Sequence, residues 1–404
     1  MINESCVHCG LCLSSCPTYL VTGVETESPR GRVWLLAQYS SGINIGETGL
    51  NHLDDCLDCR ACEEACPAHI PVGHMVNQFR IASQTGAARS VVKPLRYFLA
   101  SRRGRRRFKR LLNWSRYRLV QRAMSWFPEW IPPDALSLAS GLPEKTGEVA
   151  RPAMVPVKDG RNVMLFRGCV MEAVYGETNQ KAYDLLQMAG ARVVNPESQT
   201  CCGALLYHSG DTQALRDLVL ENLTAFDESA SGDVAVTSGG CSAFMKEYGD
   251  LFSPEDPIYA RVVRFAAAVK DISDVLVQLG LPSLPVNGRR ISMHDACHLA
   301  HAQGIRQSPR KLLQGAGYAL VEMPDADRCC GAAGTYNLTH PEMARTLQAY
   351  KVSDIPQDID AVALGNPGCQ LQIAAGLNRQ GREVPVRHTV DLLWEAYQGA
   401  KYER

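Results

Sequence analysis

The chain has 404 residues, enough for roughly two to four domains, and its 42 basic residues balance 42 acidic ones. With 46% hydrophobic and 21% charged residues, the composition excludes a disordered chain, and no apolar run is long enough for a membrane-spanning helix. Sixteen cysteines without a signal-peptide pattern argue against a disulfide scaffold and favour metal or redox chemistry.

The first eight cysteines form two copies of one motif, CVHCGLCLSSCP and CLDCRACEEACP, within residues 1–80. Both have the spacing C-x2-C-x2-C-x3-C-P of bacterial ferredoxins, in which three close thiolates hold one [4Fe–4S] cluster and the fourth reaches the other cluster. Zinc is the alternative, but zinc sites lack the third C-x2-C step and the trailing proline. We therefore expect a small, mostly helical two-cluster domain. The expected ligands are Cys6, Cys9, Cys12 and Cys66 for one cluster, and Cys56, Cys59, Cys62 and Cys16 for the other.

The segment between the two motifs contains PRGR, followed by a helix expected at 32–39 beside the clusters. Arg30 and Arg32 either offset the negative charge of the clusters or are ordinary surface arginines.

A strongly basic segment follows at 81–130. Between Glu64 and Glu129 the chain has fourteen Lys or Arg and no Asp or Glu, so the remainder carries a net charge of −14. Its apolar spacing predicts an amphipathic helix. Basic residues beside tryptophans are typical of helices that lie on anionic membranes; docking on an acidic partner subunit is the alternative, and no nucleic-acid motif is present. The candidate surface comprises Arg102, Arg103, Arg105, Arg106, Arg107, Lys109, Arg110, Trp114, Trp126 and Trp130.

A proline-containing stretch at 131–160 is interpreted as a linker. Beyond it, short β-branched runs alternate with helical patterns: strands are expected at 163–166, 192–194 and 233–237, and a helix at 212–226. Strands that alternate with helices predict a parallel α/β sheet.

The last eight cysteines reveal an internal repeat. Both quartets have the spacing C-x31-C-C-x38-C, with a glycine after the pair, and the second quartet lies 128 residues after the first. We expect two homologous α/β lobes, at 161–285 and 286–404, related by a pseudo-twofold axis, and hence an α+β protein overall. The carboxyl ends of parallel strands meet at one edge, so each quartet should converge there and could ligate a further iron–sulfur cluster. The candidate metal or redox residues are Cys169, Cys201, Cys202, Cys241, Cys297, Cys329, Cys330 and Cys369.

Two other interpretations of the lobes stay open: a metal-free scaffold, and a vicinal disulfide in either Cys-Cys pair. Four histidines also gather in the second lobe, namely His294, His298, His301 and His340. Helical spacing would place the first three on one helix face, where one could ligate a metal or relay a proton, or simply form hydrogen bonds.

This framework resembles the cysteine-rich CCG-domain family, which includes heterodisulfide reductase subunits and the iron–sulfur subunits of enzymes that oxidise glycolate, lactate and glycerol-3-phosphate. It is most similar to the iron–sulfur subunits of glycolate oxidase. The resemblance covers nearly the whole chain and rests on CVHCG, CPTY, PRGR, GCSAFMKEYG and CCGAAGTYNLTHP. The fullest form of the family ends each lobe with C-x-x-C, and in the heterodisulfide reductases it holds noncubane clusters. Here Ser238 and Asn366 replace the first of those cysteines, which argues against noncubane clusters.

The sequence has no Rossmann, P-loop or flavin motif and assigns no catalytic residue. The resemblance therefore implies an electron-transfer subunit of a glycolate (2-hydroxy acid) dehydrogenase, with substrate oxidation on a partner flavoprotein and membrane quinone as acceptor. It further implies a cytoplasmic protein, peripheral on the inner membrane. The alternative is a subunit of a D-lactate, glycerol-3-phosphate or heterodisulfide/quinone reductase complex.

Overall fold

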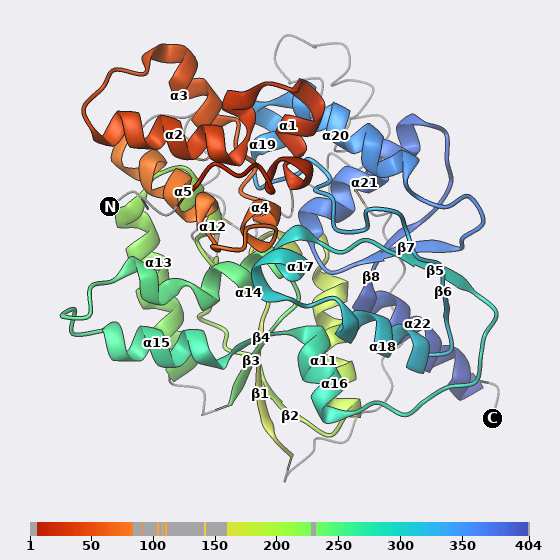
Figure 1. Ribbon diagram of the computed structural model, residues 1–404. Helices are drawn as coiled ribbons and strands as arrows, with labels where there is room; N and C mark the ends of the chain where they lie inside the picture. Colours follow the sequence, from red (N-terminus) through yellow and green to blue (C-terminus); the bar gives the residue numbers. More distant parts are fainter. Residues whose placement is uncertain are drawn as a thin grey trace.

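The computed structural model describes residues 6–83, 160–227 and 232–402, with residues 92, 103, 104, 107, 110, 141 and 142. A mostly helical N-terminal domain precedes two lobes, each built on a four-stranded parallel sheet (Figure 1), which confirms the predicted α+β class. Most of the expected linker and of the basic segment lies outside the described residues. Within that segment Arg103, Arg107 and Arg110 are helical and exposed.

The N-terminal domain consists of short helices around the two cysteine motifs. They are η1 (Leu13–Ser15), α1 (Pro17–Thr22), η2 (Glu25–Glu27), α2 (Pro29–Ser40), α3 (Gly46–Asp54), α4 (Ala61–Glu64) and α5 (Val72–Ser83). Helix α2 begins three residues earlier than expected, because Ser28 caps it by accepting a hydrogen bond from the amide of Gly31, and Pro29 fits the first helical position. Its apolar side packs on α5.

The first lobe has the strands β1 (Asn162–Phe166), β2 (Arg192–Val194), β3 (Asp233–Val236) and β4 (Val269–Asp271). Its helices are α10 (Val170–Val174), α11 (Gly176–Met188), α12 (Ala204–His208), α13 (Thr212–Asp227), α14 (Gly239–Lys246), η3 (Tyr248–Leu251), α15 (Tyr259–Ala268) and α16 (Ile272–Leu279).

The second lobe repeats this plan with the strands β5 (Arg290–Met293), β6 (Ala319–Leu320), β7 (Ala361–Leu364) and β8 (Val386–His388). Its helices are α17 (Cys297–Gln303), α18 (Gln307–Gly315), α19 (Tyr336–Thr339), α20 (Pro341–Ser353), α21 (Pro367–Arg379) and α22 (Thr389–Tyr402).

The strand order places each cysteine quartet at the same point of its sheet. The orders are β2-β1-β3-β4 and β6-β5-β7-β8, so the chain leaves the first strand of each lobe to one side and returns on the other. The crevice between β1 and β3, and likewise between β5 and β7, is therefore a topological switch point, where α/β sheets bind ligands. One cysteine follows each of these four strands closely.

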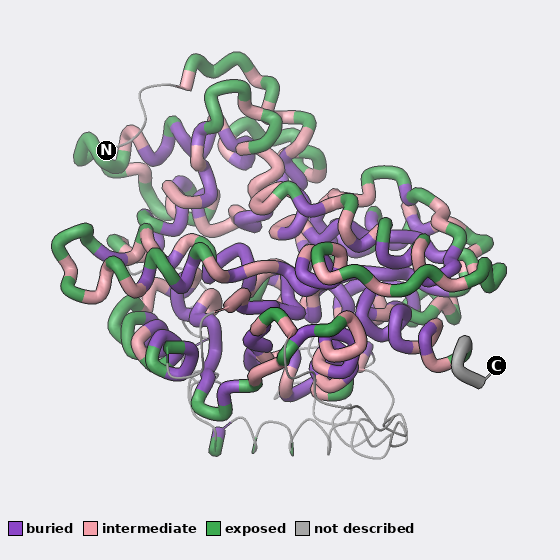
Figure 2. The backbone as a smooth tube through the Cα atoms, turned by 90° about the horizontal axis from the view of Figure 1, so that it is seen from below, coloured by how far each residue is buried: buried purple, intermediate pink, exposed green. Residues whose placement is uncertain are grey.

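The two lobes share one hydrophobic core. The side chains of Val163 and Leu165 from the first sheet and of Ile291 and Met293 from the second belong to the same buried cluster. Between the sheets, α11 packs on α22 and α16 packs on α18, so each lobe contributes one helix to each contact. In Figure 2 the buried segments accordingly gather in the middle of the molecule.

The N-terminal domain sits over the carboxyl ends of the strands (Figure 1, red and orange). Its helix α5 contacts α12 of the first lobe. Its helices α4 and α1 contact α17 and α20 of the second lobe. The second ferredoxin motif is thereby brought to the edge of the sheets where the lobe cysteines lie.

Candidate functional site

A cavity of about 320 Å³ lies where the N-terminal domain meets both lobes. Loops from all three parts line it, including Cys56 of the second ferredoxin motif and the Ser238–Asn366 contact between the lobes. The eight lobe cysteines all reach this cavity: Cys169, Cys201, Cys202, Cys241, Cys297, Cys329, Cys330 and Cys369. The structure therefore brings both predicted quartets together around one space.

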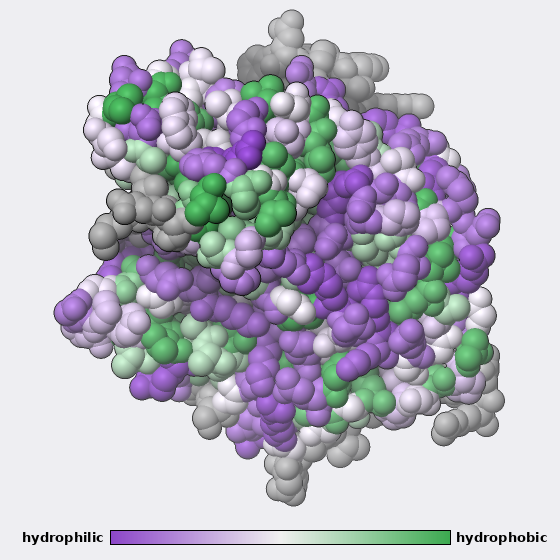
Figure 3. Space-filling model, viewed as in Figure 1, coloured by the Kyte–Doolittle hydropathy of each residue, from purple (hydrophilic) through white to green (hydrophobic). Residues whose placement is uncertain are grey.

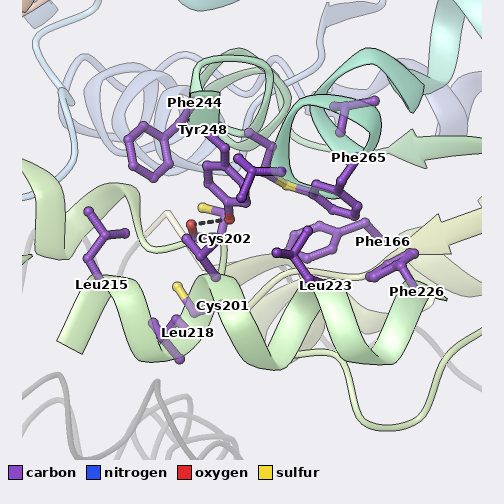
Figure 4. Close-up of a cluster of buried hydrophobic side chains, with 14 of the residues drawn as sticks. Phe166, Cys201, Cys202, Leu215, Leu218, Leu223, Phe226, Phe244, Tyr248 and Phe265 are labelled. Atoms are coloured by element: carbon purple, nitrogen blue, oxygen red, sulfur yellow. Dashed lines mark hydrogen bonds between the residues drawn. The ribbon is translucent and has the colours of Figure 1, made fainter. Parts of the chain in front are cut away.

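In the first lobe the four thiols form two close pairs. Cys169 and Cys201 are 3.3 Å apart between their sulfur atoms, and Cys202 and Cys241 are 3.2 Å apart. The contact between Cys169 and Cys201, together with burial, raises the pKa of Cys169 well above its usual value. Figure 4 shows Cys201 beside Leu218, and Cys202 beside Tyr248, whose hydroxyl donates a hydrogen bond to the Cys202 carbonyl at 2.5 Å.

The second lobe repeats the pairing. Contact with Cys329 raises the pKa of Cys297, and contact with Cys369 raises the pKa of Cys330, with burial adding to both shifts. The Asn366 amide donates a hydrogen bond to the sulfur of Cys369 at 3.4 Å. Because thiols with raised pKa values are protonated near pH 7, a metal that binds them must displace protons.

The glycine after each Cys-Cys pair allows a close approach of its neighbours. Gly203 and Gly331 have φ values of 89° and 83°, and a Cβ atom on Gly331 would lie 2.7 Å from the carbonyl oxygen of Ala344. All sixteen cysteines lie in the described ranges and are free thiols, so the vicinal disulfides considered as an alternative are not formed.

The second ferredoxin motif surrounds a small cavity of its own. Cys16, Cys56, Cys59 and Cys62 line a space of about 20 Å³ beside Arg32. Burial raises the pKa of Cys59 and of Cys62 well above the usual value. Four converging thiols are the donor set of a [4Fe–4S] cluster, so these residues fit that group, and they combine Cys16 of the first motif with three cysteines of the second.

Arg32 is a buried cation at this cluster site rather than an ordinary surface residue. Its side chain is 2% exposed, forms a 2.5 Å ion pair with Glu27, and approaches the sulfur of Cys16 to 3.8 Å. Arg30 behaves differently: it pairs with Glu25 at the surface and donates a hydrogen bond to the carbonyl of His8. Of these two arginines, Arg32 is the one placed to offset charge at the buried cluster site.

The first motif lies nearer the surface. Cys9 is exposed and Cys6 and Cys12 are half-buried, as is Cys66, the second-motif cysteine expected to share their cluster. Burial raises the pKa of Cys12, and the neighbouring thiols of Cys16 and Cys6 add to the shift. The first motif therefore offers a thiol to the outside, and the second faces the cavity.

Polar contacts fix the second motif on both lobes. Arg60 forms a bidentate ion pair with Glu247 of the first lobe, and Glu64 pairs with Arg306 of the second lobe at 2.7 Å. His298 hydrogen-bonds to the carbonyl of Asp58 at 2.7 Å. These contacts leave Cys59 in a buried cluster that includes Cys329.

His208 of α12 also approaches Asp58. Its Nδ1 atom is 3.5 Å from the Asp58 carboxylate. Burial nevertheless lowers the pKa of His208 to about 4, so the ring is neutral near pH 7.

Helical spacing predicted that His294, His298 and His301 share one helix face. The structure shows that they do not. His294 precedes α17, because the chain there is still an extension of β5, and it is fully buried. His298 and His301 lie on α17 and contact Asp58 and Glu64 of the N-terminal domain. His340 stacks on Tyr336.

The sequence reasoning missed the residues that dock the domains, above all Asp58, Arg60 and Glu247. The one signal in the sequence was that Asp58 and Arg60 stand inside the second cysteine motif. In the structure both residues have a positive φ, of 50° and 64°. Nothing in the sequence pairs Arg60 with Glu247, which lies 187 positions further along the chain.

Comparison with known proteins agrees with this arrangement. Residues 2–70 match the family model "4Fe-4S dicluster domain", and residues 163–246 and 291–374 both match "Cysteine-rich domain". The fold and its thiol sites thus define an iron–sulfur protein with a two-cluster domain and two cysteine-rich domains.

Relatives refine that class. The chain is 33% identical to the "Probable glycolate oxidase iron-sulfur subunit" of Bacillus subtilis (strain 168), covering 97% of this chain and 93% of the relative. It is 31% identical to the "Glycolate oxidase iron-sulfur subunit" of Escherichia coli (strain K12), covering 98% and 94%. "Lactate utilization protein A" of Oceanobacillus iheyensis is 30% identical over 57% of this chain and 96% of that relative. The chain belongs to the family of glycolate oxidase iron–sulfur subunits.

Among the described residues, none of the helices has both the length and the apolar character that a membrane span requires.

Proposed function

We propose that this chain is the electron-transfer subunit of a complex that oxidises glycolate or a similar 2-hydroxy acid, with flavin and substrate on a partner subunit. Its relatives are named as iron–sulfur subunits of glycolate oxidase, and another is named for lactate utilization. The sequence contains cluster motifs but no flavin motif. Substrate oxidation therefore falls to another chain.

The proposed ligands follow the motif spacing. Cys6, Cys9, Cys12 and Cys66 hold one [4Fe–4S] cluster, and Cys16, Cys56, Cys59 and Cys62 hold the other. When bound, such clusters supply one-electron transfer. The convergence of the second set on one small cavity supports this assignment. We also propose the functional division 1–80, 81–130, 131–160, 161–285 and 286–404.

The positions of the two motifs support a direction for electron transfer. The second motif forms part of the wall of the large cavity, and Cys59 is buried in the same cluster as Cys329. The first motif instead presents Cys9 at the surface. Electrons from the partner therefore enter beside Cys9 and leave toward the cavity between the lobes.

The surface around the first motif is apolar enough to dock a partner. Most of the large exposed apolar side chains in the described part of the chain belong to the N-terminal domain: Val7, Leu11, Leu20, Val24, Trp34, Tyr39 and Ile43. In Figure 3 hydrophobic residues accordingly gather over this domain, at the upper left. Exposed apolar patches of this kind mark protein interaction sites.

The test is anaerobic purification from the native cell. We expect a flavoprotein to copurify and glycolate to reduce the clusters, seen as an electron paramagnetic resonance signal of reduced [4Fe–4S]. Lactate in a parallel sample separates the two substrates suggested by the relatives. Recovery of the chain alone, with clusters that neither acid reduces, would contradict the proposal.

A matched pair of variants tests the entry surface. Val7 is 81% exposed beside Cys9, and Val286 is 83% exposed on the second lobe, so each can be changed to Asp without burying a charge. We expect Val7→Asp to slow cluster reduction by the flavoprotein at least tenfold and Val286→Asp to leave it unchanged. Equal rates in the two variants would place the docking surface elsewhere.

The acceptor side is proposed to be membrane quinone, with the basic segment holding the complex on the cytoplasmic face of the inner membrane. The support is compositional: fourteen Lys or Arg without an acidic residue between Glu64 and Glu129. Replacing Arg105, Arg106, Arg107 and Lys109 with Gln should release the complex from sedimented membranes. Attachment that is unchanged at physiological salt would favour docking on an acidic partner subunit instead.

A further inference from the structure

His294 lies beside two of the thiols of the second lobe. Its imidazole nitrogen and the sulfur atoms of Cys330 and Cys369 all lie within 4.8 Å of one another. All three residues are buried, with exposures of 0%, 1% and 4%. One nitrogen and two sulfur donors at this spacing form a ligand set for one metal ion.

The backbone orients the imidazole toward the thiols. The His294 amide donates to the carbonyl of Ala363 in β7, which continues the sheet beyond β5. The Nδ1 atom lies 2.9 Å from the carbonyl oxygen of Ala326, so Nδ1 carries the proton and Nε2 keeps its lone pair. Nε2 is buried, and the imidazole interacts with the thiol of Cys330. A ligating histidine is commonly held in this way, with its other nitrogen bonded to a carbonyl.

The first lobe lacks this donor. The residue 128 positions before His294 is Phe166, which ends β1 as His294 extends β5. Phe166 is 1% exposed, and Figure 4 shows it among the core aromatic residues with Phe226 and Phe265. Both lobes have the same cysteine spacing, so the second site differs from the first by having an imidazole donor at this position.

Two polar side chains lie beside these sulfurs and would stabilise them once a metal has displaced their protons. The Asn366 amide donates to the sulfur of Cys369, and the buried ammonium of Lys351 interacts electrostatically with Cys330. Lys351 is itself fixed by the carbonyls of Asp325 and Ala326. A divalent ion with two thiolates and a neutral imidazole carries no net charge, which suits a site that is almost completely buried.

We propose that the second lobe binds a single zinc ion through His294 Nε2, Cys330 Sγ and Cys369 Sγ. Zinc binds sulfur at about 2.3 Å and imidazole nitrogen at about 2.0–2.1 Å, so its ligands lie close together, as these three atoms do. Both sulfurs also line the large cavity, so the fourth position of a tetrahedral ion faces that cavity. Three protein ligands with one open position are the arrangement of catalytic zinc sites.

The first test is metal analysis of the full chain, purified anaerobically. We expect about one zinc per chain in addition to the cluster iron. His294→Phe, which installs the residue of the first lobe, and Cys330→Ser should each reduce zinc at least tenfold and leave iron unchanged. Cys202→Ser, the matched change in the first lobe, should keep the zinc. Zinc that survives in His294→Phe, or a loss of iron in its place, would overturn the proposal.

The second test needs no variant, so it holds even if His294→Phe does not fold. X-ray absorption at the zinc edge of the unaltered chain should show two sulfur neighbours near 2.3 Å and at least one nitrogen or oxygen neighbour near 2.0 Å. A shell of four sulfurs, or a chain that binds no zinc, would refute the site. Neither measurement depends on glycolate oxidation, so this inference and the proposed function can fail separately.

Discussion

Ser238 and Asn366 occupy equivalent positions in the two lobes, 128 residues apart, and they bind each other: the Ser238 hydroxyl donates to the Asn366 side-chain oxygen at 3.2 Å. The same oxygen accepts a hydrogen bond from the Gly240 amide, and the Asn366 nitrogen donates to Cys369. The positions at which fuller members of the family carry an extra cysteine thus form a polar link between the lobes.

Asn366→Ala should destabilise the protein by about 1–3 kcal/mol, because it leaves polar groups at the lobe interface without their partner. Ser238→Ala removes only one of these hydrogen bonds and should cost about 1 kcal/mol. Chemical denaturation under anaerobic conditions measures both. If the two variants are equally stable, the amide does not join the lobes as described.

Arg32→Gln should lower the reduction potential of the buried cluster by tens of millivolts, on the order expected for loss of a nearby charge. The Arg32 guanidinium lies 3.8 Å from the sulfur of Cys16, and a positive charge there favours the reduced, more negative cluster. A potentiometric titration followed by electron paramagnetic resonance measures the shift. Arg30→Gln is the control, since Arg30 pairs with Glu25 at the surface; an equal shift in both variants would rule out a specific effect of Arg32.

Arg60 and Glu247 should show a coupling of about 1–3 kcal/mol in a double-mutant cycle, because their ion pair is partly shielded from water. Their side chains are 13% and 28% exposed. The variants are Arg60→Gln, Glu247→Gln and the double change, and the measurement is amide hydrogen exchange over residues 54–64. Additive effects on exchange would show that the pair does not hold the N-terminal domain on the first lobe.

Acidification should weaken the lobe interface through His388. Burial lowers the pKa of this imidazole, although the Asp391 carboxylate opposes the shift; Lys181, paired with Asp391 at 2.8 Å, adds to it. His388 is neutral in the fold: Nδ1 accepts from the Val390 amide, and Nε2 donates to the Thr237 carbonyl of the other lobe at 2.8 Å.

The sign follows from the lowered pKa. Below about pH 6.5 the unfolded imidazole binds a proton that the folded one does not, so stability is lost as pH falls toward the folded pKa, by up to about 1.4 kcal/mol per pH unit. His388→Gln should flatten the pH dependence of the unfolding free energy between pH 7.5 and 5.5. His69→Gln, at an exposed histidine, should not. A slope that His388→Gln leaves unchanged would contradict this origin.

The sequence predicted the repeat and the convergence of its thiols because both follow from spacing. Cysteines that come soon after β1 and β3 must meet at one end of a parallel sheet, wherever the helices pack. The start of α2 was missed by three residues, because the Ser28 cap and Pro29 begin the helix inside the PRGR segment rather than after it.

The docking of the N-terminal domain on the lobes could not be predicted from the sequence, for a different reason. Arg60 meets Glu247, and His298 meets Asp58, only once the N-terminal domain has packed on the two lobes. Charged residues on separate elements carry no mark of their partner. The histidine prediction was wrong for a related reason: the four-residue spacing of His294 and His298 suggested a helix, but sheet bonding to Ala363 keeps His294 extended.

The packing of helices between the lobes has a consequence for a chain that contains only one lobe. Helix α11 of the first lobe is covered by α22 of the second, and α18 is covered by α16. A chain ending after the first lobe would expose this apolar face, and a second copy of the same chain could cover it in the way that the second lobe does. The duplicated protein therefore has the architecture of a homodimer whose subunits have been joined end to end. That connection allows one half to carry a histidine where the other keeps a phenylalanine, an asymmetry unavailable to two identical subunits.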